Sequence, residues 1–155
     1  MNSKNDTSIE GVKIVPLKIF SDERGSVSHM LKSSDPHFIR FGEIYFSMIK
    51  HGVTKAWKNH KIVTANYACI HGEVRFVMYD ERVESSTRGA FVEINIGPDN
   101  YSLVVVPPGV WNGFHGVGEP FSIVASCATE SYDPTEFERI KPDSSKIPYQ
   151  WPEQP

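Results

Sequence analysis

Ten short runs of strand-forming residues, separated by turn signals, constrain this chain more than any other feature. The turns recur at intervals of about eight to twelve residues, a spacing typical of a β-sandwich, a jelly roll or a β-barrel. The expected strands cover residues 12–20, 26–31, 38–49, 53–57, 62–70, 73–79, 91–96, 101–106, 111–115 and 121–127. Only residues 134–139 are expected to form a helix, with Asp133 as its N-cap and Pro134 in the first helical position. The pattern therefore predicts an all-β fold with one short C-terminal helix.

The 155 residues suffice for one domain, which we place at residues 11–155. Residues 1–10 are polar and are expected to form a flexible arm. Residues 147–155 carry three prolines and predict an extended tail. The strand over residues 101–106 is apolar on both faces, which is typical of a strand buried in a double-layered barrel or in a dimer-forming sheet.

The composition excludes several classes of function. A net charge of −3 with a pI near 6.1 argues against a nucleic-acid-binding protein, which usually has a basic face. No apolar run reaches the roughly 20 residues that a membrane span needs, and the N-terminus lacks the apolar segment of a secretory signal. Two cysteines, Cys69 and Cys127, cannot build a disulfide framework. We therefore expect a cytoplasmic protein.

Two separated segments, Gly52–Gly72 and Pro107–Phe114, resemble in their spacing the two motifs of the cupin superfamily, a small jelly-roll barrel. In metal-binding cupins, three histidines and a glutamate at set positions of these motifs hold one metal ion. The corresponding residues here are Lys58, His60, Ala65 and Asn112. One histidine and a neutral amide cannot supply the three or four ligands that a divalent ion requires. We expect no metal ion and no other cofactor.

A closer resemblance, over nearly the whole chain, is to the dTDP-4-dehydrorhamnose 3,5-epimerase family of metal-free cupins. It rests on segments that occur in the family's order: Asp22–Gly25, Gly72–Val74, Tyr79–Arg82, Ser86–Gly89, Val106–Phe114, Ser131–Pro134 and Asp143–Pro152. The resemblance implies a C₂ homodimer that acts on a 4-keto-6-deoxyhexose linked to a nucleoside diphosphate. It also implies a role in deoxysugar biosynthesis, for example for the O-antigen of lipopolysaccharide.

Such an epimerase uses the acidity of the C3 hydrogen beside the C4 ketone. A base removes that proton, donors stabilise the resulting enolate, and a proton returns on the opposite face of the sugar. The family's base histidine, enolate-stabilising lysine and acid tyrosine correspond here to Lys58, Ala65 and Ser126. The aspartate that holds the family's base corresponds to Asp143. The resemblance therefore implies the fold, whereas three central catalytic residues differ.

Lys58 and His60 are candidates to replace the missing base, because residues i and i+2 of a strand share one face. His60 titrates near neutrality, which favours it as the base. Burial in a barrel lowers the pKa of a lysine, so Lys58 is expected to stabilise the enolate or to act as an alternative base. Asp143 is expected to orient the base. Tyr132 or Tyr45 could return the proton, although either could equally serve packing.

The expected substrate-binding residues are Arg24, Tyr45, Trp111, Asn112, Phe114 and Ser126. The guanidinium fork of Arg24 suits a diphosphate. Trp111 and Phe114 either stack on the nucleotide or sugar or pack in the core. Two other functions stay open: a nucleotide-sugar 3,4-ketoisomerase, whose His-x-His-Lys run is similar to Lys58–Lys61, and a non-catalytic cupin that binds a sugar nucleotide.

Overall fold

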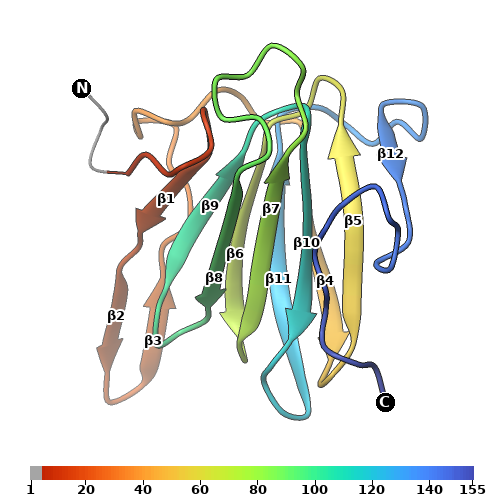
Figure 1. Cartoon of the computed structure of the whole chain (residues 1–155). Helices are drawn as coiled ribbons and strands as arrows, with labels where there is room; N and C mark the ends of the chain where they lie inside the picture. Colours follow the sequence, from red (N-terminus) through yellow and green to blue (C-terminus); the bar gives the residue numbers. More distant parts are fainter. Residues whose placement is uncertain (1–4) are drawn as a thin grey trace.

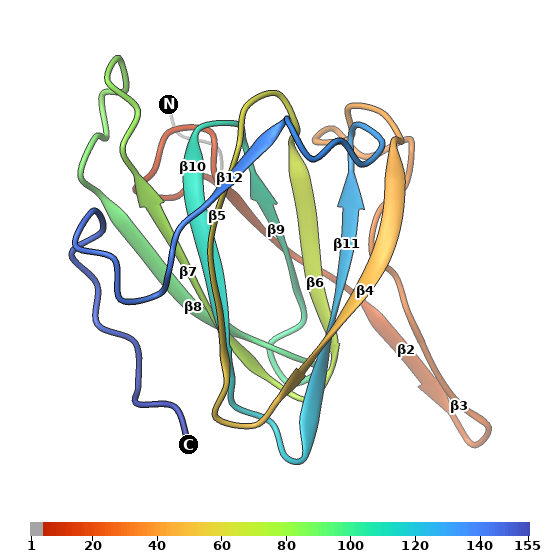
Figure 2. The ribbon, with the colours of Figure 1, turned by 90° about the vertical axis from the view of Figure 1, so that its right-hand side faces the viewer.

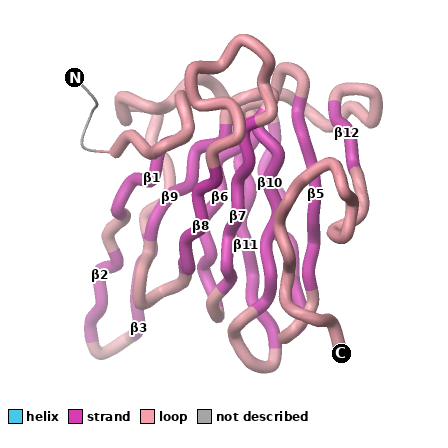
Figure 3. The backbone as a smooth tube through the Cα atoms, in the orientation of Figure 1, coloured by secondary structure: helices cyan, strands magenta, loops and turns pink. Residues whose placement is uncertain are grey.

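The computed structural model describes residues 5–155, and this part of the chain contains strands but no helix (Figure 3). The strands are β1 (Lys13–Pro16), β2 (Ile19–Asp22), β3 (Gly25–Ser28), β4 (Glu43–Lys50), β5 (Thr54–His60), β6 (Ala65–His71), β7 (Val74–Asp80), β8 (Phe91–Ile96), β9 (Ser102–Val106), β10 (Val110–Gly116), β11 (Phe121–Ala128) and β12 (Phe137–Arg139). The predicted all-β class is confirmed. Within the described residues, no helix could cross a membrane.

The strands form two five-stranded antiparallel sheets that pack face to face (Figures 1 and 2). The first sheet has the order β1-β9-β6-β11-β4, and the second has the order β12-β5-β10-β7-β8. Strands β2 and β3 form a separate hairpin. Figure 2 shows this hairpin projecting from the side of the first sheet that faces away from the second sheet. The arrangement is a β-sandwich of the expected kind.

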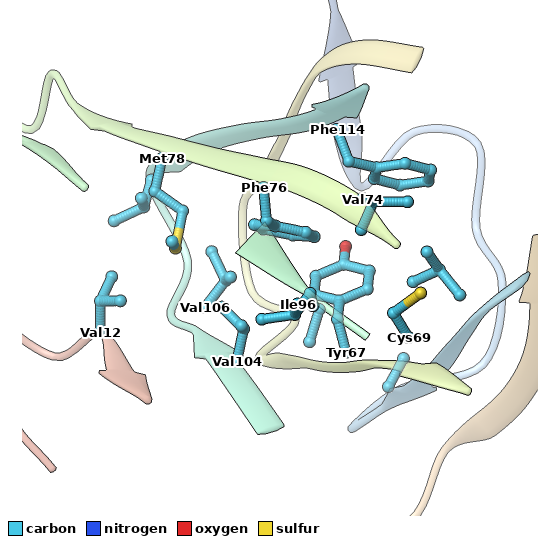
Figure 4. Packing of buried hydrophobic residues seen from close by; sticks show 14 of the residues in the cluster. Val12, Tyr67, Cys69, Val74, Phe76, Met78, Ile96, Val104, Val106 and Phe114 are labelled. Carbon is cyan, nitrogen blue, oxygen red and sulfur yellow. The ribbon is translucent and has the colours of Figure 1, made fainter. Parts of the chain in front are cut away.

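The core lies between the two sheets and is built by alternate residues of each strand. The ring of Phe76 in β7 contacts two other rings there. Its centroid is 5.1 Å from that of Tyr67 in β6 and 5.9 Å from that of Phe114 in β10. Figure 4 shows the Tyr67 ring between the two sheets, with its hydroxyl pointing toward the second. These rings fill the core next to a cavity between the two sheets, and Tyr67 and Phe114 line that cavity.

Both faces of β9 are apolar because each packs against a different layer. Val104 and Val106 face the core, whereas Leu103 and Val105 lie under a satellite cluster on the outer face of the first sheet. That cluster is formed by side chains of the segment around β1 to β3, among them Val15, Leu17, Ile19, Met30 and Leu31. Both faces of β9 are therefore buried within one protomer.

The C-terminal tail is extended, as predicted, and it covers the outer face of the second sheet. Ile147 and Trp151 are buried there in one cluster with Trp57 and Trp111. The rings of Trp57 and Trp151 lie 5.0 Å apart. The tail thus shields the outward side chains of β5 and β10 from water.

The predicted helix over residues 134–139 is wrong. Phe137–Arg139 form strand β12, which pairs with β5 so that Phe137 lies opposite His60 and Arg139 opposite Lys58. Asp133 does act as a cap, but of a turn: its Oδ1 accepts hydrogen bonds from the backbone N–H and the hydroxyl of Thr135. Six residues are too few for a helix that lacks tertiary support, and pairing with β5 satisfies the same backbone groups.

Residues 5–10 do not behave as the expected flexible arm, and residues 1–4 lie outside the described part of the chain. Ile9 is only 1% exposed and belongs to the main core. The Thr7 hydroxyl donates to the Val12 carbonyl over 3.1 Å, and the Glu10 N–H donates to Thr87 Oγ1 over 2.9 Å. The apolar side chain of Ile9, isolated among polar residues, explains why composition alone suggested an arm.

Replacing Ile9 with alanine should lower the free energy of unfolding by about 2–5 kcal/mol, because the change leaves a cavity in the core. Urea denaturation measures this loss. Val83→Ala is the control, since Val83 is 72% exposed and its truncation should cost less than about 0.5 kcal/mol. An equally small loss for Ile9→Ala would show that the segment does not belong to the core.

Candidate active site

A cavity of about 420 Å³ lies between the two sheets, beside strands β4 and β5. Its first wall includes Tyr45, Ser126 and Tyr67 of the first sheet, and its second wall includes Lys58, Asn112 and Arg139. Strand pairing explains both groups, because residues paired across antiparallel strands point to the same face. Tyr45, Ser126 and Tyr67 are paired across β4, β11 and β6, as are Arg139, Lys58 and Asn112 across β12, β5 and β10.

A β-bulge in β5 brings a further lysine to the cavity. Lys55 pairs with Phe114 and Lys58 pairs with Asn112, so three steps along β5 match two along β10. Without this extra residue, two lysines three positions apart would point to opposite faces. Lys55 lines the cavity and its ammonium donates to Ser47 Oγ over 2.9 Å.

His60 and Glu136 form a buried pair in a small recess next to the cavity. His60 Nδ1 lies 2.6 Å from Glu136 Oε2. The other carboxylate oxygen accepts hydrogen bonds from the backbone N–H groups of Lys61, Ile62 and Val63 over 2.9, 2.9 and 3.0 Å. One carboxylate therefore fixes both the imidazole and the turn that follows β5.

The electrostatics of the pair favour a neutral imidazole beside an ionised carboxylate. Burial lowers the pKa of His60 below its ordinary value, against the opposing hydrogen bond with Glu136. Burial also acts to raise the pKa of Glu136, but the hydrogen bonds from His60, Ile62 and Val63 outweigh it, and the net shift is downward. His60 Nδ1 thus carries the proton that is donated to Glu136, and Nε2 is left as the basic nitrogen.

Lys58 lies in both the cavity and the recess. Its ammonium is 4.4 Å from the ring centre of Phe137, and the guanidinium carbon of Arg139 is 5.1 Å from the same centre. Burial lowers the pKa of Lys58, and the neighbouring charge of Arg139 lowers it further, while Glu136 and Glu43 oppose the shift. A cationic donor is thus held next to the neutral imidazole.

Most of the sequence-predicted site residues come together here. The cavity and the recess are lined by seven of them: Lys58, His60, Tyr45, Asn112, Phe114, Ser126 and Tyr132. Asn112 Nδ2 donates to the Lys58 carbonyl over 3.2 Å, and Phe114 packs on Phe76. Tyr132 is 66% exposed at the rim of the recess, with its ring 5.9 Å from that of Phe137.

The structure places three other predicted residues elsewhere. Trp111 is buried on the outer face of the second sheet, where its Nε1 donates to Glu81 Oε2 over 3.0 Å. Asp143 is exposed and lines a separate hollow beside the C-terminal tail, so Glu136 holds the position on His60 that we expected for Asp143. Arg24 lies in the turn of the β2–β3 hairpin and pairs with Asp22 over 2.6 Å.

Sequence reasoning missed Glu136, Arg139 and Lys55. Glu136 and Arg139 fall in the segment predicted to be helical, and Phe137, the one apolar residue between them, is too little to reveal a strand by alternation. The bulge that turns Lys55 inward has no signal in the sequence. Among residues 5–155, no three His, Cys, Asp or Glu side chains lie close enough together to hold a metal ion.

Comparison with known proteins identifies the family of this chain. The family model described as dTDP-4-dehydrorhamnose 3,5-epimerase matches residues 6–155. The chain belongs to this family of sugar epimerases.

Individual members of the epimerase family match this chain over most of their length. One is the probable low-salt glycan biosynthesis epimerase Agl13 of Haloferax volcanii, which is 32% identical over 92% of this chain and 89% of its own length. The crystal structure of a dTDP sugar isomerase from Desulfovibrio desulfuricans has a TM-score of 0.90 and 39% identity, and the match covers 93% of this chain and 92% of that one. A 3,5-epimerase from Legionella pneumophila, solved with dTDP-4-keto-L-rhamnose, has a TM-score of 0.83 and 25% identity over 95% and 81% of the two chains.

Glu136→Gln should lower the free energy of unfolding by about 1–3 kcal/mol, because a neutral amide accepts the hydrogen bonds of His60 and residues 61–63 less well. It should also lower the pKa of His60 further, since the carboxylate that favours the charged imidazole is lost. Urea denaturation and NMR titration of His60 measure the two effects. Glu138→Gln is the matched control on the exposed side of β12, and equal behaviour of both variants would contradict the pairing.

Proposed function

We propose that this epimerase acts on a 4-keto-6-deoxyhexose linked to a nucleoside diphosphate and inverts C3, or both C3 and C5. The observation that carries the proposal is the neutral His60, which is oriented by Glu136 and lies with Lys58 in the recess next to the cavity. The Legionella relative was solved with a sugar of this class, and the Haloferax relative is named for glycan biosynthesis. Deoxysugar biosynthesis for a surface glycan such as an O-antigen is the corresponding pathway, and two free, buried cysteines fit a cytoplasmic location.

In this mechanism, His60 Nε2 removes the C3 proton, and its electron pair delocalises to the C4 oxygen as an enolate. The Lys58 ammonium stabilises that oxygen, and Glu136 stabilises the imidazolium that forms. A proton then returns to C3 from the opposite face while the ketone re-forms. Asp143 lines a different hollow, and Glu136 is the carboxylate that contacts His60.

The two other candidate functions differ from epimerisation in their products. A 3,4-ketoisomerase would move the carbonyl to C3 through an enediol, and the Lys58–Lys61 run supports it. A non-catalytic cupin would bind the sugar nucleotide without any exchange at C3, and the substitutions Lys58, Ala65 and Ser126 support that reading. The buried acid–base pair is the reason for preferring catalysis to binding alone.

Proton NMR in D₂O with dTDP-4-keto-6-deoxyglucose as substrate tests the proposal. The wild-type protein should incorporate deuterium at C3 and form the C3 epimer, and His60→Asn should slow both by about 10²–10⁴-fold with little change in affinity. His71→Asn, an exposed histidine at the end of β6, is the control. If Lys58→Met abolishes exchange while His60→Asn loses less than about tenfold, Lys58 is the base. A ketone at C3 would indicate the isomerase, and binding without exchange would indicate the non-catalytic cupin.

We also propose that the protein is a homodimer that pairs through the outer face of the first sheet. Alternate residues of β4 expose large apolar side chains on that face, namely Ile44, Phe46 and Met48. The projecting hairpin exposes Phe20 and Val27. The hairpin and β4 lie at opposite ends of the sheet in Figure 1, so a twofold axis would lay each hairpin against the partner's β4.

This dimer would also give Arg24 a function. The side chain of Arg24 is 82% exposed at the tip of the hairpin, away from the cavity of its own protomer, whose walls come from β4, β5, β6, β10, β11 and β12. A hairpin lying against the partner's β4 would bring its Arg24 to the mouth of the partner's cavity. The guanidinium could then contact the diphosphate of the substrate.

Mixed dimers test both parts of this arrangement. Light scattering should show a dimer at micromolar concentration. Arg24→Ala and His60→Asn should each be impaired alone, whereas a mixed dimer purified through two different tags should regain about half of the wild-type activity, because one of its sites is complete. Unmixed variants treated identically are the control. A monomer in solution, or no recovery on mixing, would contradict the arrangement.

A further inference from the structure

Epimerisation requires a proton donor on the wall of the cavity that faces the base. His60 and Lys58 both belong to β5 in the second sheet. Removing the proton and returning it from this one wall would regenerate the original configuration at C3. The donor that inverts the centre must therefore project from the first sheet, and the family's acid position on that sheet holds Ser126.

Tyr45 occupies the required place. It projects from β4 of the first sheet and lines both the main cavity, with Lys58, and the recess that contains His60. It is paired with Ser126 across β4 and β11, and the Ser126 hydroxyl acts to lower the pKa of the phenol. The phenol thus comes from the strand next to the one that carries the family's acid, and Ser126 lies beside it.

The environment of Tyr45 keeps its phenol protonated and in contact with the cavity. Burial raises the pKa of Tyr45 above its ordinary value, against the opposing hydrogen bond from Ser126. The side chain is nevertheless 37% exposed, so a phenolate formed during turnover can recover a proton from water. The positive charge of Arg139, which acts on Tyr45 from the opposite wall, would stabilise that phenolate for its short lifetime.

The other tyrosines near the site are placed less well. Tyr132 is 66% exposed at the rim, lines only the recess, and contacts Phe137 of β12 on the base's own sheet. Tyr67 lies on the correct wall, but it is only 3% exposed and packs on Phe76. Burial raises the pKa of Tyr67 far above its ordinary value. A phenolate there would be both costly to form and slow to reprotonate.

We infer that Tyr45, paired with Ser126 across β4 and β11, is the catalytic acid that delivers the proton to C3 on the face opposite His60. This inference rests on the proposed epimerase function. In the step, the O–H bond of Tyr45 breaks as the new C3–H bond forms and the enolate returns to the ketone. The Tyr45 phenolate then takes a proton from water, and the His60 imidazolium releases one to water, so that no net proton is consumed.

Tyr45→Phe in D₂O separates proton removal from inversion. The substitution removes only the hydroxyl, so His60 should still abstract the C3 proton and return a deuteron to the same face after its own proton has exchanged with cavity water. We expect deuterium incorporation into the starting sugar to stay within about tenfold of wild type, while formation of the C3 epimer falls by about 10²–10⁴-fold. NMR of the same sample measures both. Tyr132→Phe and Tyr67→Phe test the two other tyrosines near the site. Tyr79→Phe, in the cluster on the outer face of the second sheet, is the matched control that should retain inversion.

Each result decides the assignment. Wild-type inversion in Tyr45→Phe would overturn it, and loss of inversion in Tyr132→Phe or Tyr67→Phe alone would give the role to that residue. Loss of exchange together with inversion in Tyr45→Phe would also overturn it, because a pure donor is not needed for abstraction. A wild-type protein that neither exchanges nor inverts would instead refute the proposed epimerase function, and the assignment of Tyr45 would fall with it.

Discussion

The hydrogen bonds of the Glu136 carboxylate are the constraint on which the rest of the site depends. One oxygen holds three consecutive backbone N–H groups just after β5, and the other holds His60. The same contact brings the chain back along β5, so that Phe137 and Arg139 pair with His60 and Lys58. A buried carboxylate without these partners would cost several kcal/mol, of about the size of a whole domain's stability margin. The positions of His60 and of the edge strand β12 beside Lys58 are therefore fixed by one residue.

In a β-sandwich, a functional group can be supplied from a neighbouring strand without a change in the geometry of the site. Two walls about one sheet spacing apart present rows of side chains at each register position, and any residue in the row reaches the same space. Across β4, β11 and β6 the row reads Tyr45, Ser126, Tyr67. A phenol can thus be supplied from β4 when β11 carries a serine. On the other wall, His60 lies two residues beyond Lys58 and faces the same interior.

The sequence predicted every strand except β12, together with most of the cavity wall. Period-two alternation within a strand indicates which of its residues share a face. Lys58 and His60 were found in this way, whereas Asn112 and Ser126 were found through the family resemblance. Glu136 was missed because a turn residue reveals its partners only through long-range pairing, here over 76 positions to His60. Trp111 was ambiguous for a related reason. The outer face of β10 is buried because the C-terminal tail covers it, and the residue of the tail that packs in this cluster, Trp151, lies 40 positions further along the chain.

Electrostatics explains how a chain with a net charge of −3 could bind the anionic sugar nucleotide that we propose as its substrate. Overall charge acts over the whole surface, whereas binding depends on the local field inside a cavity with low-dielectric walls. Lys55, Lys58 and Arg139 all line the cavity, and the bulge in β5 and the pairing of β12 place them there. Glu136, the nearby carboxylate, is turned toward His60 and the backbone. The bulge in β5 and the pairing of β12, which the sequence did not reveal, thus give the cavity a positively charged interior.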